Sequence, residues 1–180
     1  YIDEENIKDK LDGLNGIIVA PGFGQRGIDG KILTIQYARV NNIPFFGICL
    51  GMQMAVIEYA KNVKKIIDPN STEISEKCKN PVIDLMTNQK EIINKGGTMR
   101  LGAWDCEIIK DTKSHSIYDE KLISERHRHR YEFNNNYDDK IFDKNFVKAG
   151  VNPETDLVEI IENKSHPWFI GVQFHPEYKS

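Results

Sequence analysis

The chain has 180 residues, of which 28% are charged and 39% are hydrophobic, and its formal net charge is −3. This composition is typical of one globular domain with a substantial core. The slightly acidic balance excludes a general basic field for nucleic acid, and no apolar run reaches the length of a membrane span. We therefore expect neither a nucleic-acid partner nor a membrane partner.

The three cysteines, Cys49, Cys78 and Cys106, are an odd number and lack the Cys-x-x-Cys spacing that is typical of zinc sites. They predict neither a disulfide framework nor a bound metal. Such a sequence suits a reducing compartment, so we expect a cytoplasmic protein.

The first half of the chain alternates between strand-like and helix-like segments. The expected elements are a strand over 16–20, a glycine-rich loop over 22–27, a helix near 31–41, a strand over 45–48 and a helix over 52–63. Asp29 is expected to cap the first helix. This order predicts an α/β fold with a doubly wound, mostly parallel sheet and flanking helices.

The second half of the chain has a different character. Residues 66–96 are polar with weak periodicity, and short strands and turns are expected from Gly97 onward. The stretch 134–148 is rich in Asn, Asp and Lys, which predicts a surface segment. Apolar runs predict late strands over 157–161 and 169–174.

A cysteine at a predicted sharp turn is the most informative feature. The segment Gly47-Ile48-Cys49-Leu50-Gly51 joins the second strand to its helix, which is the layout of a nucleophile elbow with cysteine in place of serine. The helix N-terminus that follows is expected to lower the pKa of the Cys49 thiol. The alternative is a small core residue, because an isolated cysteine is usually buried and inert.

A candidate base and its partner follow the last predicted strand. His175 is expected at the carboxyl end of that strand, at the sheet edge where Cys49 also lies and where sites gather in α/β sheets. Glu177 stands two residues further on, and Pro176 restricts the backbone between them. Cys49, His175 and Glu177 are therefore a candidate catalytic triad. The alternative for an isolated His-Pro pair is a simple turn.

Several segments carry a resemblance to a known family. The sequence is similar to the triad-type, class I glutamine amidotransferases, and in particular to the glutaminase domains of CTP synthases. The segments are GICLGMQ (47–53), QFHPE (173–177), PGFGQRG (21–27), GGTMRLG (96–102) and ERHRHRYE (125–132). The first two are widespread among amidotransferases, whereas the last two are more specific to the CTP synthases.

The resemblance implies roles for individual residues. Cys49 would attack the side-chain carboxamide of L-glutamine, with His175 moving protons and Glu177 orienting it, to release glutamate and ammonia. The backbone N–H groups of Gly22 and Leu50 would form the oxyanion hole. The implied glutamine-binding residues are Gly22, Leu50, Gly51, Met52, Gln53, Glu73 and Arg130. Without the resemblance, Glu73 would be interpreted as a solvated loop carboxylate.

The resemblance also implies parts of the protein beyond these residues. We expect residues 1–180 to be a glutaminase domain without its first strand–helix unit, linked covalently to a synthase domain. That domain would bind ATP, UTP and Mg²⁺ and aminate UTP to CTP; no Walker-type phosphate loop occurs here. The full protein is expected to be a homo-oligomer, a tetramer, that GTP activates. Arg26 and Gly27 would belong to a lid linked to GTP.

Other functions remain compatible with parts of the sequence. One is the glutaminase component of GMP or carbamoyl-phosphate synthesis, and another is a catalytically silent regulatory module. The run Arg126-His127-Arg128-His129-Arg130 also fits a strand with one charged face, as an exposed basic stripe for phosphate or nucleic acid.

Overall fold

The computed structural model describes residues 1–85 and 99–178. Residues 96–98, the first part of the motif expected at 96–102, lie outside this range. In the part of the chain that the structure describes, every helix is too short or too polar to cross a membrane.

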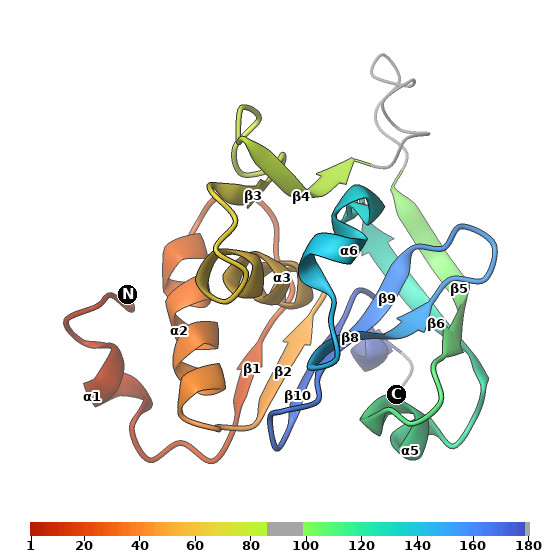
Figure 1. The fold of residues 1–180 in the computed structure, drawn as a ribbon, viewed down its shortest axis with the longest axis horizontal. Coiled ribbons are helices and arrows are strands. Elements are labelled where there is room, and N and C mark those ends of the chain that lie inside the picture. The colour runs from red at the N-terminus through yellow and green to blue at the C-terminus, as the bar shows by residue number, and fades with distance from the viewer. Residues whose placement is uncertain (86–98, 179–180) are drawn as a thin grey trace.

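Strands and helices follow one another along the chain as Figure 1 shows. The helices are α1 (Ile7–Leu11), α2 (Ile28–Val40), α3 (Leu50–Asn62), α5 (Lys113–Tyr118) and α6 (Asp138–Ile141), with short 3₁₀ helices η1 (Asn135–Tyr137) and η2 (Pro176–Tyr178). The strands are β1 (Ile17–Val19), β2 (Phe45–Ile48), β3 (Pro69–Ser71), β4 (Asn80–Leu85), β5 (Arg100–Ile108), β6 (Leu122–His129), β7 (Tyr131–Phe133), β8 (Phe146–Val151), β9 (Val158–Asn163) and β10 (Phe169–Val172).

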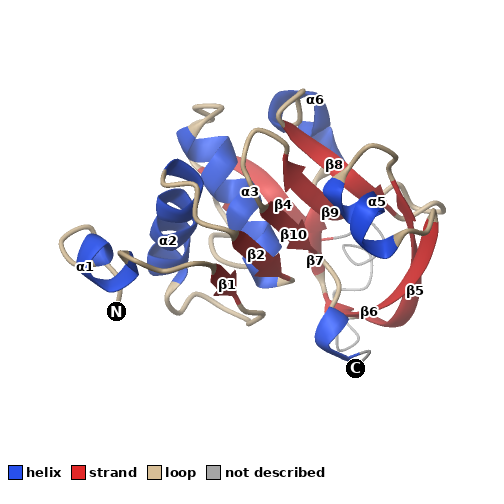
Figure 2. Ribbon diagram, turned by 90° about the horizontal axis from the view of Figure 1, so that it is seen from below, coloured by secondary structure: helices blue, strands red, loops and turns tan. Residues whose placement is uncertain are grey.

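The main sheet has seven strands in the order β1-β2-β10-β9-β8-β5-β6. Within it, β1, β2 and β10 pair in parallel, whereas the pairings from β10 to β6 are antiparallel. The sheet is therefore mixed, and the expectation of a mostly parallel sheet holds only for its first three strands. For β8, β9 and β10 the reason is that the turns 152–157 and 164–168 are too short for a crossover helix. In Figure 2 the antiparallel part, with β5 and β6, curls round.

Helices lie on both faces of this sheet, as expected of a doubly wound fold. Ile161 of β9 points into the core under α3. Its neighbour Glu162 points to the opposite face, because side chains alternate along a strand. There its carboxylate accepts hydrogen bonds from the backbone N–H groups of Lys113 and Ser114, at 2.9 and 2.6 Å, where α5 begins. The expected fold class is confirmed in its flanking helices and its elbow.

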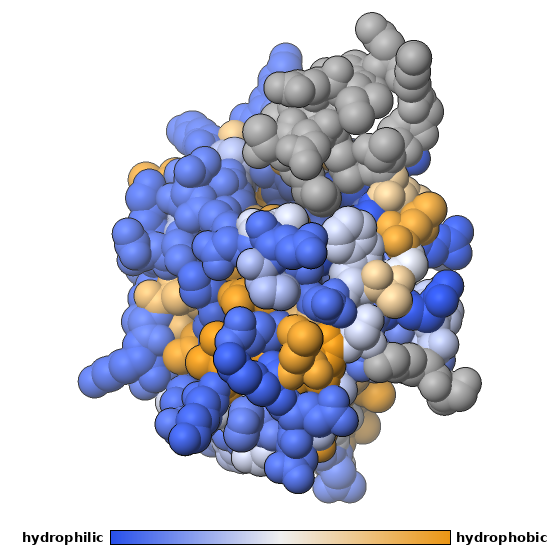
Figure 3. Space-filling view, turned by 90° about the vertical axis from the view of Figure 1, so that its right-hand side faces the viewer, coloured by the Kyte–Doolittle hydropathy of each residue, from blue (hydrophilic) through white to orange (hydrophobic). Residues whose placement is uncertain are grey.

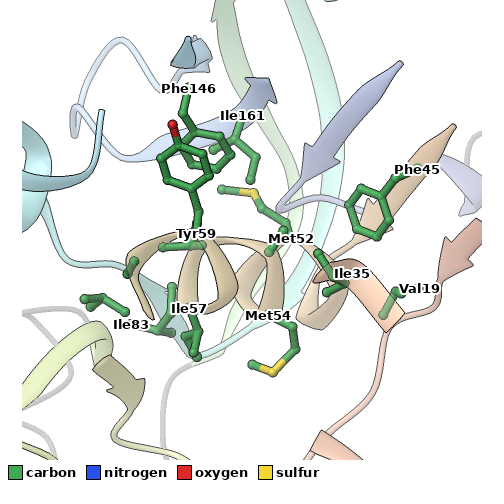
Figure 4. Close-up of a cluster of buried hydrophobic side chains, with 14 of the residues drawn as sticks. Val19, Ile35, Phe45, Met52, Met54, Ile57, Tyr59, Ile83, Phe146 and Ile161 are labelled. Carbon is green, nitrogen blue, oxygen red and sulfur yellow. The ribbon is translucent and has the colours of Figure 1, made fainter. Parts of the chain in front are cut away.

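The core lies between α2, α3 and the first three strands. Figure 4 shows side chains of α3 packed against strands of the main sheet, including Phe146 of β8, and Ile57 of α3 beside Ile83 of β4 in the second, smaller sheet. The rings of Phe45 and Phe169 lie 4.4 Å apart on neighbouring strands, and Tyr59 of α3 stacks on Phe146 at 4.1 Å. α3 is buried along most of its length, which anchors the elbow at its N-terminus.

A second sheet of three strands, β3-β4-β7, lies beside α3. β3 and β4 are parallel, and β4 and β7 are antiparallel. This sheet places Glu73, which follows β3, near Tyr131, which begins β7; both residues line one cavity. It therefore forms one wall of the site described below.

Three expectations about single segments are corrected. α2 begins after Gly27, whose positive φ of 72° suits glycine, so Asp29 lies in the first turn instead of capping the helix. The stretch 134–148 is not merely a surface segment, because Tyr137, Ile141 and Phe146 are buried in the core. β5 and β6 are long strands, not short ones, since they pair along nearly their whole length.

One outer face of the molecule is mostly hydrophilic, with hydrophobic residues in small separate areas (Figure 3). Such a distribution is ordinary for a globular surface, and the described residues on this face form no broad apolar patch.

Candidate active site

Cys49 lies at a sharp turn between β2 and α3, as the elbow motif predicts. Its φ of 52° and ψ of −104° lie outside the regions that L-residues prefer, and such strain is typical of functional turns. Its backbone N–H donates to the carbonyl of Val172 at 2.7 Å, which ties the elbow to the end of β10. Cys49 is 3% exposed, so it faces the interior of the site.

The two glycines of the motif allow this turn to pack tightly. A Cβ on Gly51 would lie 2.1 Å from the carbonyl oxygen of Val19, and one on Gly47 would lie 2.7 Å from the backbone of Gly51. Both distances are far below van der Waals contact. The glycines therefore let β1, β2 and the start of α3 approach one another, and this approach holds Cys49 in place.

His175 and Glu177 form the hydrogen-bonded pair that the sequence predicts. The Nδ1 atom of His175 lies 2.7 Å from Oε1 of Glu177, and the imidazole stacks on Tyr178 with ring centroids 5.0 Å apart. The carboxylate accepts, so Nδ1 carries the proton in the neutral ring and Nε2 is free to act as a base. Nε2 is buried and has no hydrogen-bond partner among the described residues.

The sheet topology brings the cysteine and the histidine to one edge. β2 and β10 are parallel neighbours, with Ile48 opposite Val172. Cys49 is the first residue after β2, and His175 is the third after β10. Both therefore extend from the carboxyl ends of adjacent strands, as expected for a site in an α/β sheet.

A cavity of about 150 Å³ opens beside the cysteine. Its lining comprises Gly22, Phe23, Cys49, Gln53, Glu73, Met99, His129, Arg130 and Tyr131. Five of these, Gly22, Cys49, Gln53, Glu73 and Arg130, are site residues predicted from the sequence. A nucleophile, an acidic side chain and a basic side chain thus share one small cavity, and this combination suits a zwitterionic amino acid.

The comparisons with known proteins agree with this arrangement. A family model described as glutamine amidotransferase class-I matches residues 1–180. The chain belongs to the class-I glutamine amidotransferases. A CTP synthase of Flavobacterium johnsoniae is 60% identical over 180 residues, which are 100% of this chain and 34% of that protein. This amidotransferase chain therefore spans about a third of the length of the curated relatives it matches.

Two solved structures share the amidotransferase fold. The glutaminase domain of Trypanosoma brucei CTPS, solved with bound acivicin, matches with a TM-score of 0.89 and 40% identity, covering 99% of this chain and 72% of that one. A glutamine amidotransferase from Thermotoga maritima matches with a TM-score of 0.60 and 16% identity, covering 92% and 57%, and shows the fold alone. The chain is thus a glutaminase domain of the CTP synthase type.

The thiol of this amidotransferase is protonated in the absence of substrate. Burial raises the pKa of the Cys49 thiol to about 12, and the carboxylates of Glu132, Glu73 and Glu177 raise it further. The backbone N–H of Leu50 acts in the opposite direction but does not prevail. The expectation of a lowered pKa is therefore wrong for this state, because desolvation of the thiolate outweighs the helix N-terminus.

The glutamine-binding residues expected from the amidotransferase family occupy two kinds of position. Gln53 and Glu73 line the cavity and are held by hydrogen bonds: Nε2 of Gln53 donates to the carbonyl of Tyr131 at 2.9 Å, and Oε1 of Glu73 accepts from the N–H of Gly24 at 3.0 Å. Leu50 and Met52 are buried in α3 and are not among the described lining residues.

Arg26 and Gly27 do not join the described residues that line the cavity. Both are exposed on the turn before α2, beyond the loop residues Gly22 and Phe23 that do line it. A link to a lid therefore stays a prediction. In the part of the chain described, no group of three or more His, Cys, Asp or Glu side chains is arranged to hold a metal ion.

The strand β6 sorts the Arg/His run into two faces. His127 and His129 are buried, whereas Arg126 and Arg128 are exposed, as the alternating sequence predicts for a strand. Arg130 follows β6 and reaches the cavity wall. The run is therefore not a uniform basic stripe, since its histidines belong to the interior.

A buried charged cluster beneath the site was not expected. Its members are Arg100 of β5, His127 and His129 of β6, Glu132 of β7 and Glu159 of β9. Nη2 of Arg100 lies 2.6 Å from Glu159 and Nη1 lies 3.4 Å from Glu132. Nδ1 of His127 lies 2.8 Å from Nε2 of His129. Only the tertiary fold gathers these residues, because they come from four strands.

Gln173 is a further site residue that sequence reasoning did not single out. Its side chain is fully buried, and its Nε2 lies 3.7 Å from Sγ of Cys49. It is the first residue of the QFHPE motif, which also contains His175 and Glu177. The available signal was a polar side chain inside the apolar run over 169–174, two residues before the candidate base.

Proposed function

We propose that this domain hydrolyses L-glutamine to glutamate and ammonia through a thioester on Cys49. The observation that carries the proposal is the cavity in which the strained Cys49 faces Glu73 and Arg130. Arg130 suits the α-carboxylate of glutamine and Glu73 suits its α-ammonium group, so the side-chain carboxamide would be directed toward Sγ. Membership of the amidotransferase family supports the same substrate.

The proposed chemistry proceeds in two halves. Nε2 of His175 takes the thiol proton as Sγ attacks the carboxamide carbon, and the tetrahedral oxyanion is stabilised by the N–H groups of Gly22 and Leu50. His175 then protonates the departing nitrogen, and ammonia leaves with formation of the γ-glutamyl thioester. Next, His175 activates water to hydrolyse the thioester. Glu177 stabilises the imidazolium during both halves.

The high pKa of Cys49 fits this sequence of events. A thiol that stays protonated until substrate arrives is protected from adventitious reaction. In the proposed mechanism the ammonium group of the substrate neutralises Glu73, which is one of the carboxylates that raise the pKa of Cys49. Proton transfer to His175 thereby becomes easier when glutamine is bound.

The ammonia is proposed to serve a linked synthase domain that aminates UTP to CTP with ATP and Mg²⁺, under activation by GTP. The identity to curated CTP synthases, of which this chain spans about a third, supports a larger protein. We also propose that the larger protein supplies the first strand–helix unit of the glutaminase domain and that it assembles as a tetramer. Three free cysteines suit a reducing compartment, which supports a cytoplasmic location.

Acivicin and glutamine provide the test of the proposal. The thiolate of Cys49 is expected to displace the chloride of acivicin, so the peptide that contains Cys49 should gain the mass of acivicin less HCl. L-glutamine is expected to yield glutamate, and Cys49→Ala should abolish both results. Cys78→Ala is the matched control, because Cys78 lies outside the cavity lining. If the wild-type protein shows no labelling and forms no glutamate, the result would instead indicate a silent regulatory module.

A second measurement identifies the ammonia acceptor. Full-length protein supplied with glutamine, ATP and UTP is expected to form CTP. Glutamine hydrolysis coupled to a different acceptor, with no CTP formed, would instead assign the domain to GMP or carbamoyl-phosphate synthesis.

A further inference from the structure

Gln173 lies between the nucleophile and the wall of the cavity. It follows β10 directly, its side chain is fully buried, and its backbone N–H donates to the carbonyl of Glu159 at 2.8 Å. The preceding residue, Val172, accepts from the backbone N–H of Cys49 at 2.7 Å. Main-chain hydrogen bonds therefore hold the start of the Gln173 side chain beside the elbow.

The orientation of the Gln173 carboxamide follows from a chain of hydrogen bonds. The carbonyl of Tyr131 can only accept, so the group of Gln53 that lies 2.9 Å from it must be Nε2. The same Nε2 donates to Oε1 of Gln173 at 3.2 Å. The remaining end of the Gln173 amide is then Nε2, which lies 3.7 Å from Sγ of Cys49. The N–H group therefore points at the sulfur.

A donor at this position favours the thiolate over the thiol. Burial and the carboxylates of Glu73, Glu132 and Glu177 raise the pKa of Cys49 and act against a negative charge on the sulfur, and the backbone N–H of Leu50 only partly opposes them. Among the described residues, the other charged or titratable groups of the cavity lining are His129, Arg130 and Tyr131, and His175 lies at the neighbouring strand end. A hydrogen bond to the charged form offsets part of the cost of forming it.

We propose that Gln173 is a catalytic residue that donates its side-chain N–H to Sγ of Cys49 and stabilises the thiolate as His175 removes the proton. The expected effect of Gln173 on kcat rests on the glutaminase reaction proposed above. Its expected effect on the reactivity of the Cys49 thiol does not. Gln53 takes part as the partner that orients the amide. Gln53 therefore links the sulfur to β7, which contributes Tyr131 to the cavity wall.

Two variants remove this donor, and one variant is a control. Gln173→Met has a similar volume and no N–H group, while Gln173→Asn keeps the amide but shortens its reach to the sulfur. Gln36→Met makes the same chemical change on α2, where Gln36 lies in a groove away from Cys49. The measurements on the full-length protein are the rate of alkylation of the Cys49 peptide by iodoacetamide as a function of pH, and kcat and KM for glutamine. Circular dichroism checks that each variant is folded.

Both Gln173 variants are expected to slow the alkylation of Cys49 about tenfold or more at every pH below the pKa of the thiol, because a hydrogen bond to the charged form is lost and the thiolate fraction falls. They are also expected to lower kcat by roughly 10- to 100-fold while KM changes less than about threefold. Gln36→Met is expected to match the wild type in all three quantities. Gln173→Asn provides the result if Gln173→Met fails to fold.

An unchanged alkylation profile in a folded Gln173 variant would overturn the inference, whatever happens to kcat. A raised KM with unchanged kcat would also overturn it, since Gln173 would then act only through Gln53 on substrate binding. If the wild-type protein does not hydrolyse glutamine but the alkylation profile still shifts in the variants, the proposed function fails and the donor role of Gln173 stands.

Discussion

Gly51 shows at the scale of one residue how backbone approach determines the site. A methyl group there would lie 2.1 Å from the carbonyl oxygen of Val19. That oxygen belongs to the backbone of β1, so no flexible side chain can move aside to relieve the contact. The elbow therefore depends on the absence of a side chain as much as on the presence of the Cys49 thiol.

Gly51→Ala is expected to lower the free energy of unfolding by about 3 kcal/mol or more, because overpacking against backbone cannot be relieved by a rotamer change. Urea denaturation measures the effect. The control is Gly16→Ala, where the nearest atom would lie at an ordinary 3.6 Å. Equal stabilities for the two variants would show that the approach of β1 to the elbow is not tight.

Glu177→Gln is expected to lower kcat for glutamine hydrolysis roughly 10²- to 10⁴-fold with little change in KM, because His175 loses the charge that stabilises its imidazolium. Steady-state kinetics measure both parameters. Glu107→Gln is the matched control, since the two carboxylate side chains are 38% and 39% exposed and Glu107 pairs with Lys121 on the surface. A similar kcat for both variants would remove Glu177 from the triad.

At the scale of elements, an ion pair fastens α2 to α3. The guanidinium of Arg39 donates two hydrogen bonds to the carboxylate of Glu58, at 2.9 and 2.7 Å, and Glu58 is fully buried. This contact raises the pKa of Arg39 and keeps a charge in the interior. Because α3 begins at the nucleophile, the pair also steadies the element that positions Cys49.

Arg39→Met is expected to lower the free energy of unfolding by about 3 kcal/mol or more, because it leaves the buried carboxylate of Glu58 without its cation. The double variant Arg39→Met/Glu58→Met should recover most of this loss, since no unpaired charge remains. Lys121→Met, which breaks the exposed pair with Glu107, is expected to cost less than about 1 kcal/mol. Thermal or urea unfolding of the wild type and the three variants checks the order. A double variant no more stable than Arg39→Met would contradict the argument.

At the scale of the whole molecule, the buried cluster couples stability to pH in two opposite ways. Burial lowers the pKa of His127 to about 2 and that of His129 to about 3, so the stability they contribute is lost as the pH falls below about 6.5. Burial raises the pKa of Glu159 to about 7 and also raises that of Glu132, so their contribution is lost as the pH rises. The cluster therefore favours a stability maximum between about pH 4.5 and 6.5.

His127→Gln tests this linkage. Wild type and variant differ in one titrating histidine. The free energy of unfolding of the wild type minus that of the variant is therefore expected to fall by up to about 1.4 kcal/mol per pH unit as the pH drops below 6.5. The sign follows because only the unfolded wild-type chain takes up this proton. Urea titrations at pH 5, 6, 7 and 8 measure the difference. A difference that is constant with pH would contradict a buried neutral His127.

Local patterns in the sequence were sufficient for much of the fold. The apolar runs before Cys49 and His175 correctly predicted β2 and β10, because a short buried strand is a continuous run of hydrophobic residues in the sequence. The mixed direction of the sheet was missed, since strand pairing joins distant segments and is not written in any one of them. The segment 134–148 was misjudged because three core residues are hidden among polar neighbours.

The sequence by itself determined the chemistry that is available: a cysteine at a glycine-flanked turn, a histidine with its carboxylate two residues away, and motifs that assign the family. Each of these depends on residues close together in the chain. Only the tertiary structure decided what surrounds the sulfur. The pKa of Cys49, the buried cluster of Arg100 and the amide of Gln173 beside Sγ depend on segments far apart in the chain, whose burial and contacts exist only once the chain has folded.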